Sequence, residues 1–298
     1  MKIIVTGSLG NISKPLTTEL VQKGHTVTVI SSKADKQKNI EALGANAAIG
    51  SIEDADFLTA TFMGADAIYT MVPPKGFLDQ NFDVIAYYDK IGTNYAQAIR
   101  QSGIKRVVHL SSIGADLDKG TGLILGHNKV EGILNNLLDI AITYMRPTAF
   151  HYNLYSFLPA IKNTGSIASN YGAEDKIVWV SPIDIAAAVA AEIVTPLKGK
   201  KVLYVASDEL TCIEVAGILG AAIGKPDLKW VLIPDEQVQH GLEAFGLSKQ
   251  VAAALVELNA SMHKGKFFDD YYQNRPQVMG KVTMTDFAKE FAATYNKG

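Results

Sequence analysis

Two periodicities alternate along the first half of this chain, and no other feature of the sequence constrains its fold as strongly. Short, nearly continuous apolar runs rich in β-branched residues are typical of strands that are buried on both faces of a parallel sheet. Segments with amphipathic helical spacing lie between these runs. This repeated alternation predicts an α/β fold built on a doubly wound parallel sheet. The expected strands are residues 2–6, 26–31, 65–71, 106–110 and 141–146, and the expected helices include residues 55–62 and 82–101.

The rhythm changes after residue 147, where Pro147, Pro159 and Gly165 interrupt the alternation. We expect a larger N-terminal domain, residues 1–150, and a smaller C-terminal α/β part, residues 151–298, with segments interleaved with the sheet. The smaller part should cover the carboxyl edge of the sheet, where open α/β sheets bind ligands. Its expected helices are residues 184–194, 212–223, 236–245, 249–263 and 284–295, and its expected strands are residues 201–205 and 229–233.

Composition excludes several classes of protein. Hydrophobic residues make up 48% of the 298 residues and charged residues 19%, which excludes global disorder. A net charge of -2 excludes a basic field over the whole protein, so we expect no nucleic-acid partner. No apolar stretch approaches the roughly 18 residues that span a bilayer, and the first apolar run is too short for a signal peptide. The chain has one cysteine, Cys212, so it can form no internal disulfide, and its histidines lack the spacing of a zinc site. We therefore expect a cytoplasmic protein without membrane or metal partners.

The strongest chemical signal is a glycine turn, residues 6–13, which read Thr-Gly-Ser-Leu-Gly-Asn-Ile-Ser. It follows the first expected strand directly and opens an amphipathic helix. Glycines in such a turn let main-chain N–H groups approach a pyrophosphate at the positive end of the helix. The turn therefore predicts a dinucleotide site, the alternative being a tight turn without a ligand. The predicted contacts are Gly7, Ser8, Leu9, Gly10, Asn11 and Ile12.

Five further segments read Gly-Ala-Asp-Ala-Ile (64–68), Arg-Val-Val-His-Leu-Ser-Ser (106–112), Tyr-Met-Arg-Pro (144–147), Phe-His-Tyr-Asn (150–153) and Ser-Pro-Ile-Asp-Ile-Ala (181–186). Together with the glycine turn, their order and spacing resemble those of the NmrA-like family of atypical short-chain dehydrogenases, over nearly the whole length. The resemblance implies a Rossmann domain that binds NAD(P) and a smaller substrate-side subdomain. Serine stands where the family has its third glycine, whose chief role is close packing of helix on strand.

The end of the second expected strand bears on the choice of nicotinamide cofactor. NAD-preferring sites usually carry a carboxylate there, which binds the ribose 2′-hydroxyl. This chain has Ser31, Ser32 and Lys33 instead, which suit a 2′-phosphate, so we expect NADP(H) over NAD(H). The alternative for Lys33 is a solvated loop lysine. Ser51 stands where many members of the family have an aspartate for the adenine, and we expect a weaker hydrogen bond from it.

The resemblance also implies contacts at the ends of the later strands. The segments that follow residues 65–71, 106–110 and 141–146 should lie beside the nicotinamide and the substrate. Further cofactor contacts are expected from Met71, Val72, Pro73, Ser111, His127, Pro147, Thr148, Ala149 and Phe150. The expected substrate pocket consists of Pro74, Phe77, Phe150, His151 and Tyr152.

The chain lacks the tyrosine of the Tyr-x-x-x-Lys pair with which short-chain dehydrogenases protonate a carbonyl. If Glu131 is the glutamate that family members have four residues after the lysine, His127 takes the lysine's place and Leu123 the tyrosine's. If Lys129 is instead the lysine of the pair, the position four residues before it also holds no tyrosine. We predict His127, as a ribose ligand or an acid, and Ser112 as catalytic residues. The alternatives are a surface histidine without a role and a serine that caps a turn.

These observations predict an NADPH-dependent oxidoreductase that passes hydride to a small electrophile, a quinone. A ketone becomes a strongly basic alkoxide and needs a positioned acid, whereas a quinone becomes a weakly basic phenolate and needs mainly proximity and orientation. The resemblance leaves a second class open, a non-catalytic NADP(H) sensor with a protein partner. A nucleotide-sugar epimerase-like enzyme is a weaker alternative, which the absent tyrosine disfavours.

Overall fold

The computed structural model describes residues 1–264 and 266–297 of the chain. Its centre is a seven-stranded sheet in which every neighbouring pair is parallel, as the alternating pattern predicts. Strand order places β1 between β4 and β2, so the chain reverses its direction of winding beside β1. From one edge to the other the strands are β10 (Lys200–Val205), β6 (Ala141–Pro147), β5 (Arg106–Leu110), β4 (Ala67–Thr70), β1 (Lys2–Val5), β2 (Thr26–Ser31) and β3 (Asn46–Ile49).

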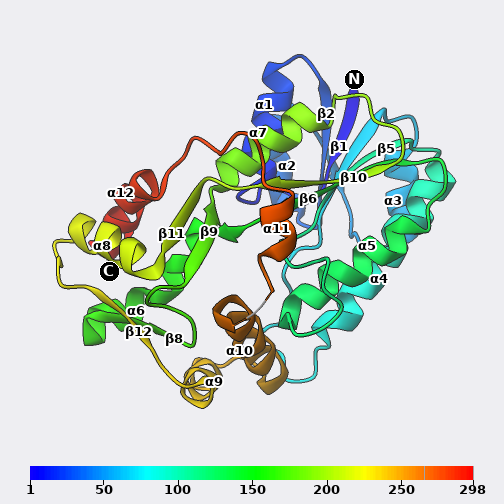
Figure 1. Cartoon of the computed structure of the whole chain (residues 1–298). Coiled ribbons are helices and arrows are strands. Elements are labelled where there is room, and N and C mark those ends of the chain that lie inside the picture. Colours follow the sequence, from blue (N-terminus) through cyan, green and yellow to red (C-terminus); the bar gives the residue numbers. More distant parts are fainter. Residues whose placement is uncertain (265, 298) are drawn as a thin grey trace.

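Helices cover both faces of this sheet (Figure 1). Central strands such as β4 and β5 are therefore buried along their whole length, which explains their continuous apolar runs. One face carries α1 (Ser13–Gln22), α2 (Gln37–Glu41) and α7 (Pro182–Glu192). The other carries α3 (Ala55–Phe62), α4 (Val84–Ser102) and α5 (Leu125–Asn135).

The C-terminal part builds two small sheets and a helical cover. Their shared core contains the buried aromatic side chains Trp179, Tyr271 and Phe291. One sheet has the order β11 (Asp208–Thr211), β9 (Lys176–Val180), β7 (Ala149–Phe150), and the other pairs β12 (Lys229–Leu232) with β8 (Ser166–Ser169). The helices are α6 (Leu158–Thr164), α8 (Cys212–Ala222), α9 (Asp235–Ala244), α10 (Lys249–Lys264), α11 (Asp269–Gln273) and α12 (Met284–Tyr295), with 3-10 helices η1 (Ala34–Lys36), η2 (Gly122–Ile124) and η3 (His151–Phe157).

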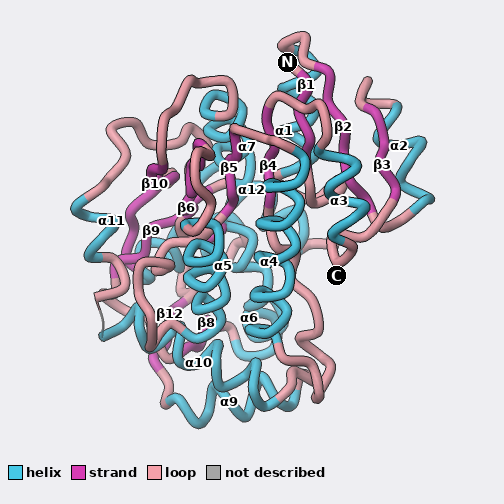
Figure 2. Tube along the Cα trace, turned by 90° about the vertical axis from the view of Figure 1, so that its right-hand side faces the viewer, coloured by secondary structure: helices cyan, strands magenta, loops and turns pink. Residues whose placement is uncertain are grey.

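The helix α10 packs directly on the main chain of η2. A Cβ added to Gly122, whose φ is +54°, would lie 1.8 Å from the carbonyl oxygen of Ala254. At the start of α10, the N–H of Ser248 donates to the carbonyl of Phe77 at 3.0 Å. The loop after β4, the start of α5 and α10 are therefore held together, and Figure 2 shows α9 and α10 below α5. No helix among the described residues is long and apolar enough to cross a membrane.

Several elements lie outside the sequence predictions. The edge strand β3 pairs only with β2 and reads Asn-Ala-Ala-Ile, without the apolar run that marks a central strand. The short strands β7, β8, β9 and β11 and the helices α2, α6 and α11 were also not predicted from periodicity. The predicted ranges 55–62 and 284–295 match α3 and α12, since their amphipathic patterns are clear and a side chain caps the start of each helix.

Candidate functional site

The glycine turn joins β1 to α1 through two residues in left-handed backbone conformation, Gly7 with φ +86° and Ser8 with φ +54°. A Cβ at Gly7 would lie 2.6 Å from the hydroxyl of Ser13, so a larger residue has no room there. The buried Ser13 hydroxyl donates to the carbonyl of Thr6 at 2.8 Å. Serine in place of the third glycine thus forms a hydrogen bond between the first residue of the helix and the end of the strand.

The start of α1 presents free main-chain donors. The N–H groups of Leu9, Asn11 and Ile12 have no hydrogen-bond acceptor in the part of the chain that the structure describes. Gly10, between them, has no side chain that would cover them. Unpaired N–H groups at the positive end of a helix are the donors that a pyrophosphate takes. The residues present therefore fit the predicted dinucleotide.

The tip of β2 is tied to this turn. The hydroxyl of Ser8 donates to that of the buried Ser31 at 2.9 Å, and Ser31 Oγ accepts the N–H of Lys33 at 3.2 Å. The side chains of Ser32 and Lys33 are exposed, and Lys33 forms no ion pair with the described residues. Ser51 follows β3, is exposed and accepts the N–H of Glu53 at 3.1 Å. The Lys33 ammonium and the Ser32 hydroxyl thus stand exposed next to the serine that is bonded to the turn.

The predicted nicotinamide contacts follow the carboxyl ends of β4, β5 and β6. Met71 is joined to the turn, because its N–H donates to the hydroxyl of Thr6 at 3.0 Å. Ser112 is half-buried and its hydroxyl donates to the carbonyl of Ile113 at 2.9 Å. Thr148 is buried, and its hydroxyl has no partner among the described residues. The parallel topology brings these side chains to the same edge as the glycine turn. The other predicted contacts there are Val72, Pro73, Pro147, Ala149 and Phe150.

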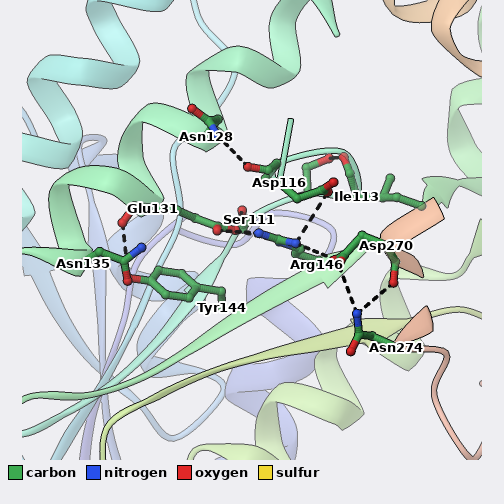
Figure 3. Close-up of polar contacts among 12 residues, drawn as sticks. Ser111, Ile113, Asp116, Asn128, Glu131, Asn135, Tyr144, Arg146, Asp270 and Asn274 are labelled. Carbon is green, nitrogen blue, oxygen red and sulfur yellow. Dashed lines mark hydrogen bonds and ion pairs between the residues drawn. The ribbon is translucent and has the colours of Figure 1, made fainter. Parts of the chain in front are cut away.

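Ser111 takes part in a buried hydrogen-bond network at the end of β5. It is buried, and its hydroxyl donates to Glu131 at 2.6 Å. Glu131 in turn accepts two hydrogen bonds from the guanidinium of Arg146, at 2.9 Å from Nε and 2.7 Å from Nη2 (Figure 3). The Ser111 hydroxyl is therefore part of a buried network that joins β5, β6 and α5, and its contact with the cofactor stays a prediction.

Two more carboxylates extend this ion pair. Nη1 of Arg146 lies 2.9 Å from Asp270 in α11 and 3.6 Å from Asp116, and it also donates to the hydroxyl of Tyr204 at 3.1 Å. Burial raises the pKa of Asp116. Sequence reasoning missed this network, although an arginine within the apolar run of β6 was a signal for a buried partner.

His127 lies in the first turn of α5, with its ring edge-on to Tyr88 and the ring centroids 5.0 Å apart. Its Nδ1 is buried without a partner among the described residues, and burial lowers its pKa to about 4. A second buried imidazole, His109 in β5, shares a hydrogen bond of 2.9 Å with Thr70, and burial lowers its pKa to about 3. Both rings are therefore neutral at neutral pH, which favours the ribose-binding role of His127 over the acid role.

Leu123, which the register based on Glu131 puts at the tyrosine position, lies in η2 and packs against the core between the sheet and α4. Phe77, a predicted substrate-pocket residue, packs against the same core, while Pro74 is exposed. Phe150 and Tyr152 pack on each other with ring centroids 5.0 Å apart, and His151 is buried beside them.

A comparison with protein-family models matches the NmrA-like family over residues 1–289. The chain belongs to the NmrA-like family. The resemblance predicted from the motifs is thus confirmed. The ion pair of Glu131 with Arg146 gives a physical reason for the arginine of the motif at residues 144–147, because it fixes α5 against the end of β6.

Comparisons with curated proteins and solved structures find similar proteins whose names state an activity. The chain is 26% identical to an NAD(P)H azoreductase of Xenophilus azovorans, over 98% of this chain and 99% of the relative. Among solved structures, an NADPH-dependent quinone oxidoreductase from Escherichia coli in complex with NADPH matches with a TM-score of 0.82 at 21% identity, covering 97% and 99% of the two chains. A Citrobacter triphenylmethane reductase in complex with NADP(H) matches with a TM-score of 0.78 at 19% identity, covering 97% and 99%. These structures share the fold.

Proposed function

We propose that this NmrA-like protein is an NADPH-dependent reductase whose acceptor is a quinone. The observation that carries the proposal is the row of unpaired N–H groups at Leu9, Asn11 and Ile12, linked through Ser8 and Ser31 to the free Lys33. Donors for a pyrophosphate and a cation for a 2′-phosphate thus stand on one continuous piece of structure. The azoreductase relative, similar over its whole length, supports reduction of an electron-poor acceptor.

The choice of acceptor follows from the groups that the site lacks. When bound, NADPH supplies a hydride. The side chains at the two positions of the catalytic pair, Leu123 and His127, offer no acid at neutral pH, since leucine carries no proton donor and burial keeps the imidazole neutral. An acceptor that becomes a weakly basic phenolate needs no such acid, so quinones suit this site better than ketones.

Steady-state oxidation of NADPH against a panel of quinones, aldehydes and enones tests the proposal. We expect turnover with quinones, little with aldehydes, and none in Gly10→Asp, whose carboxylate would repel the pyrophosphate. Gly10→Ala is the matched control, because its Cβ would meet only the carbonyl oxygen of Gly7, at 3.1 Å. Turnover of aldehydes in preference to quinones would contradict the choice of acceptor.

A non-catalytic NADP(H) sensor is the second candidate function, and the absence of a tyrosine at position 123 favours it. A sensor needs the glycine turn but no acceptor site. Tight NADPH binding that Gly10→Asp abolishes, together with no turnover of any acceptor, would support the sensor. The missing tyrosine also disfavours an epimerase, which must move a proton at a sugar hydroxyl.

A further inference from the structure

A pocket of about 250 Å³ lies where η3, the start of α7 and α12 meet. Its wall includes Asn11 of the glycine turn, so the pocket reaches the expected position of the cofactor. His151 and Tyr152, two of the predicted substrate residues, line it together with Tyr155 and Phe287. The pocket therefore joins the glycine turn to two of the predicted substrate residues.

Aromatic rings form part of the wall of this pocket. The ring centroids of His151 and Phe287 lie 5.5 Å apart, and those of Tyr155 and Phe287 lie 5.2 Å apart. A cavity of about 150 Å³ holds one benzene molecule. The present pocket, at about 250 Å³, thus accommodates one substituted ring.

His151 is a buried polar side chain of this pocket, whose lining also includes the polar residues Asn11, Ser181 and Glu290. The side chain is 1% exposed, and neither ring nitrogen has a hydrogen-bond partner among the described residues. The carboxylate of Asp208, which accepts the N–H of Met284 at 2.6 Å, lies 3.6 Å from Nε2 of His151. A carboxylate beside Nε2 favours the tautomer with its proton there, which leaves Nδ1 as a buried acceptor without a donor. A buried acceptor of this kind is satisfied by a ligand that donates.

We propose that this pocket binds a single aromatic ring carrying a hydroxyl or amino group, which donates a hydrogen bond to Nδ1 of His151. The assignment of this ring rests on the proposed function. A quinone that takes up a hydride from NADPH and a proton from water becomes a hydroquinone, so the reduced product carries the donor and the oxidised substrate does not. The pocket thus selects the product form of the acceptor, and hydroquinones should inhibit competitively.

Binding of phenol and of its methyl ether, anisole, tests the hydrogen bond by calorimetry on the full chain. Loss of one neutral hydrogen bond predicts about five- to tenfold weaker binding of anisole. In His151→Phe, which keeps a ring against Phe287, the two ligands should bind alike. His240→Phe, a substitution of an exposed histidine in α9, is the matched control and should keep the preference for phenol.

A second measurement covers the case in which His151→Phe does not fold. In the unmodified protein, the ¹⁵N resonance of His151 Nδ1 should shift on addition of phenol and stay unchanged on addition of anisole. Equal affinity for the two ligands, or a phenol preference that survives His151→Phe, would overturn the proposal. Selective phenol binding without any NADPH-dependent turnover would support the proposed pocket and contradict the reductase function. Quinone turnover without phenol selectivity would support the reductase function and contradict the proposed pocket.

Discussion

Lys33 is the residue on which the cofactor preference depends. It is exposed at the tip of β2, next to the Ser31 hydroxyl that is bonded to the glycine turn. Lys33→Glu replaces attraction for a 2′-phosphate by repulsion, so we expect NADPH affinity to fall about tenfold more than NADH affinity. Titration calorimetry with both cofactors measures this difference. Lys38→Glu, the same charge change on the exposed side of α2, is the control. Equal losses of affinity for NADPH and NADH would show that Lys33 does not bind the 2′-phosphate.

His127 is the residue that carries most of the catalytic prediction. If its ring orients the nicotinamide ribose, His127→Ala should lower turnover by about tenfold, or about 1.4 kcal/mol, and weaken cofactor binding moderately. Because burial lowers the pKa of this imidazole to about 4, its protonation state is constant near neutral pH. The pH profile of turnover should therefore keep its shape in the mutant.

Lys129→Ala is the matched control for the register of α5, since Lys129 is exposed on the same helix. Wild-type kinetics in His127→Ala together with a loss in Lys129→Ala would show that the register based on Glu131 is wrong. An inflection near the ordinary histidine pKa that vanishes in His127→Ala would instead restore the acid role.

At the scale of elements, the buried ion pair of Glu131 and Arg146 locks α5 to the ends of β5 and β6. Glu131→Gln removes one charge and leaves the guanidinium with poorer partners in a buried position. Breaking a buried pair in this way costs about 3–5 kcal/mol of the free energy of unfolding. Glu19→Gln, in an exposed pair with Lys23, should cost less than about 1 kcal/mol. Urea denaturation measures the free energy of unfolding of both variants. Equal small losses would show that the ion pair of Glu131 and Arg146 does not hold α5 to β5 and β6.

The elements show what periodicity can and cannot predict. The helix of residues 55–62 was predicted with its true limits because Asp54 caps its start and its apolar face is regular. Residues 149–150 and 208–211 form strands only because β9 offers them a partner, so no local pattern marks them. The same holds for the site: the glycine turn is local and was visible, whereas Asp116 and Asp270 reach Arg146 only through the fold.

At the scale of the whole molecule, residues far apart in sequence close the C-terminal part onto the sheet. Asp184, at the start of α7, accepts hydrogen bonds from Ser207 and from the N–H groups of Lys281 and Val282, at 2.7, 2.9 and 3.0 Å. The family motif at residues 181–186 contains this aspartate, but its role depends on the return of the chain at residue 280. Sequence alone could predict its presence on a helix and not its partners.

Two buried neutral histidines should make the stability of the whole protein depend on pH. The folded pKa values of His109 and His127 are about 3 and about 4, and both lie below the unfolded value of about 6.5. Below pH of about 6.5 the unfolded chain therefore binds protons that the folded protein does not, and the free energy of unfolding falls as pH falls. The slope should approach about 1.4 kcal/mol per pH unit for each histidine.

Urea denaturation between pH of about 7.5 and about 5.5, above the range in which most carboxylates titrate, measures this slope. His109→Asn keeps a hydrogen-bonding group toward Thr70 and should reduce the slope by about half. Stability that stays constant over this range, or an unchanged slope in His109→Asn, would show that these rings are not buried and neutral in solution.

The reductase assignment is tested most directly by single-turnover oxidation of NADPH in the presence of a quinone, with hydrogen or deuterium at the transferred position of the nicotinamide. If the protein catalyses hydride transfer, quinone should accelerate the oxidation, and deuterium should slow it by a factor of about two or more. Gly10→Asp should show neither effect. NADPH that binds to the wild-type protein and is oxidised no faster with a quinone than without one would contradict the assignment.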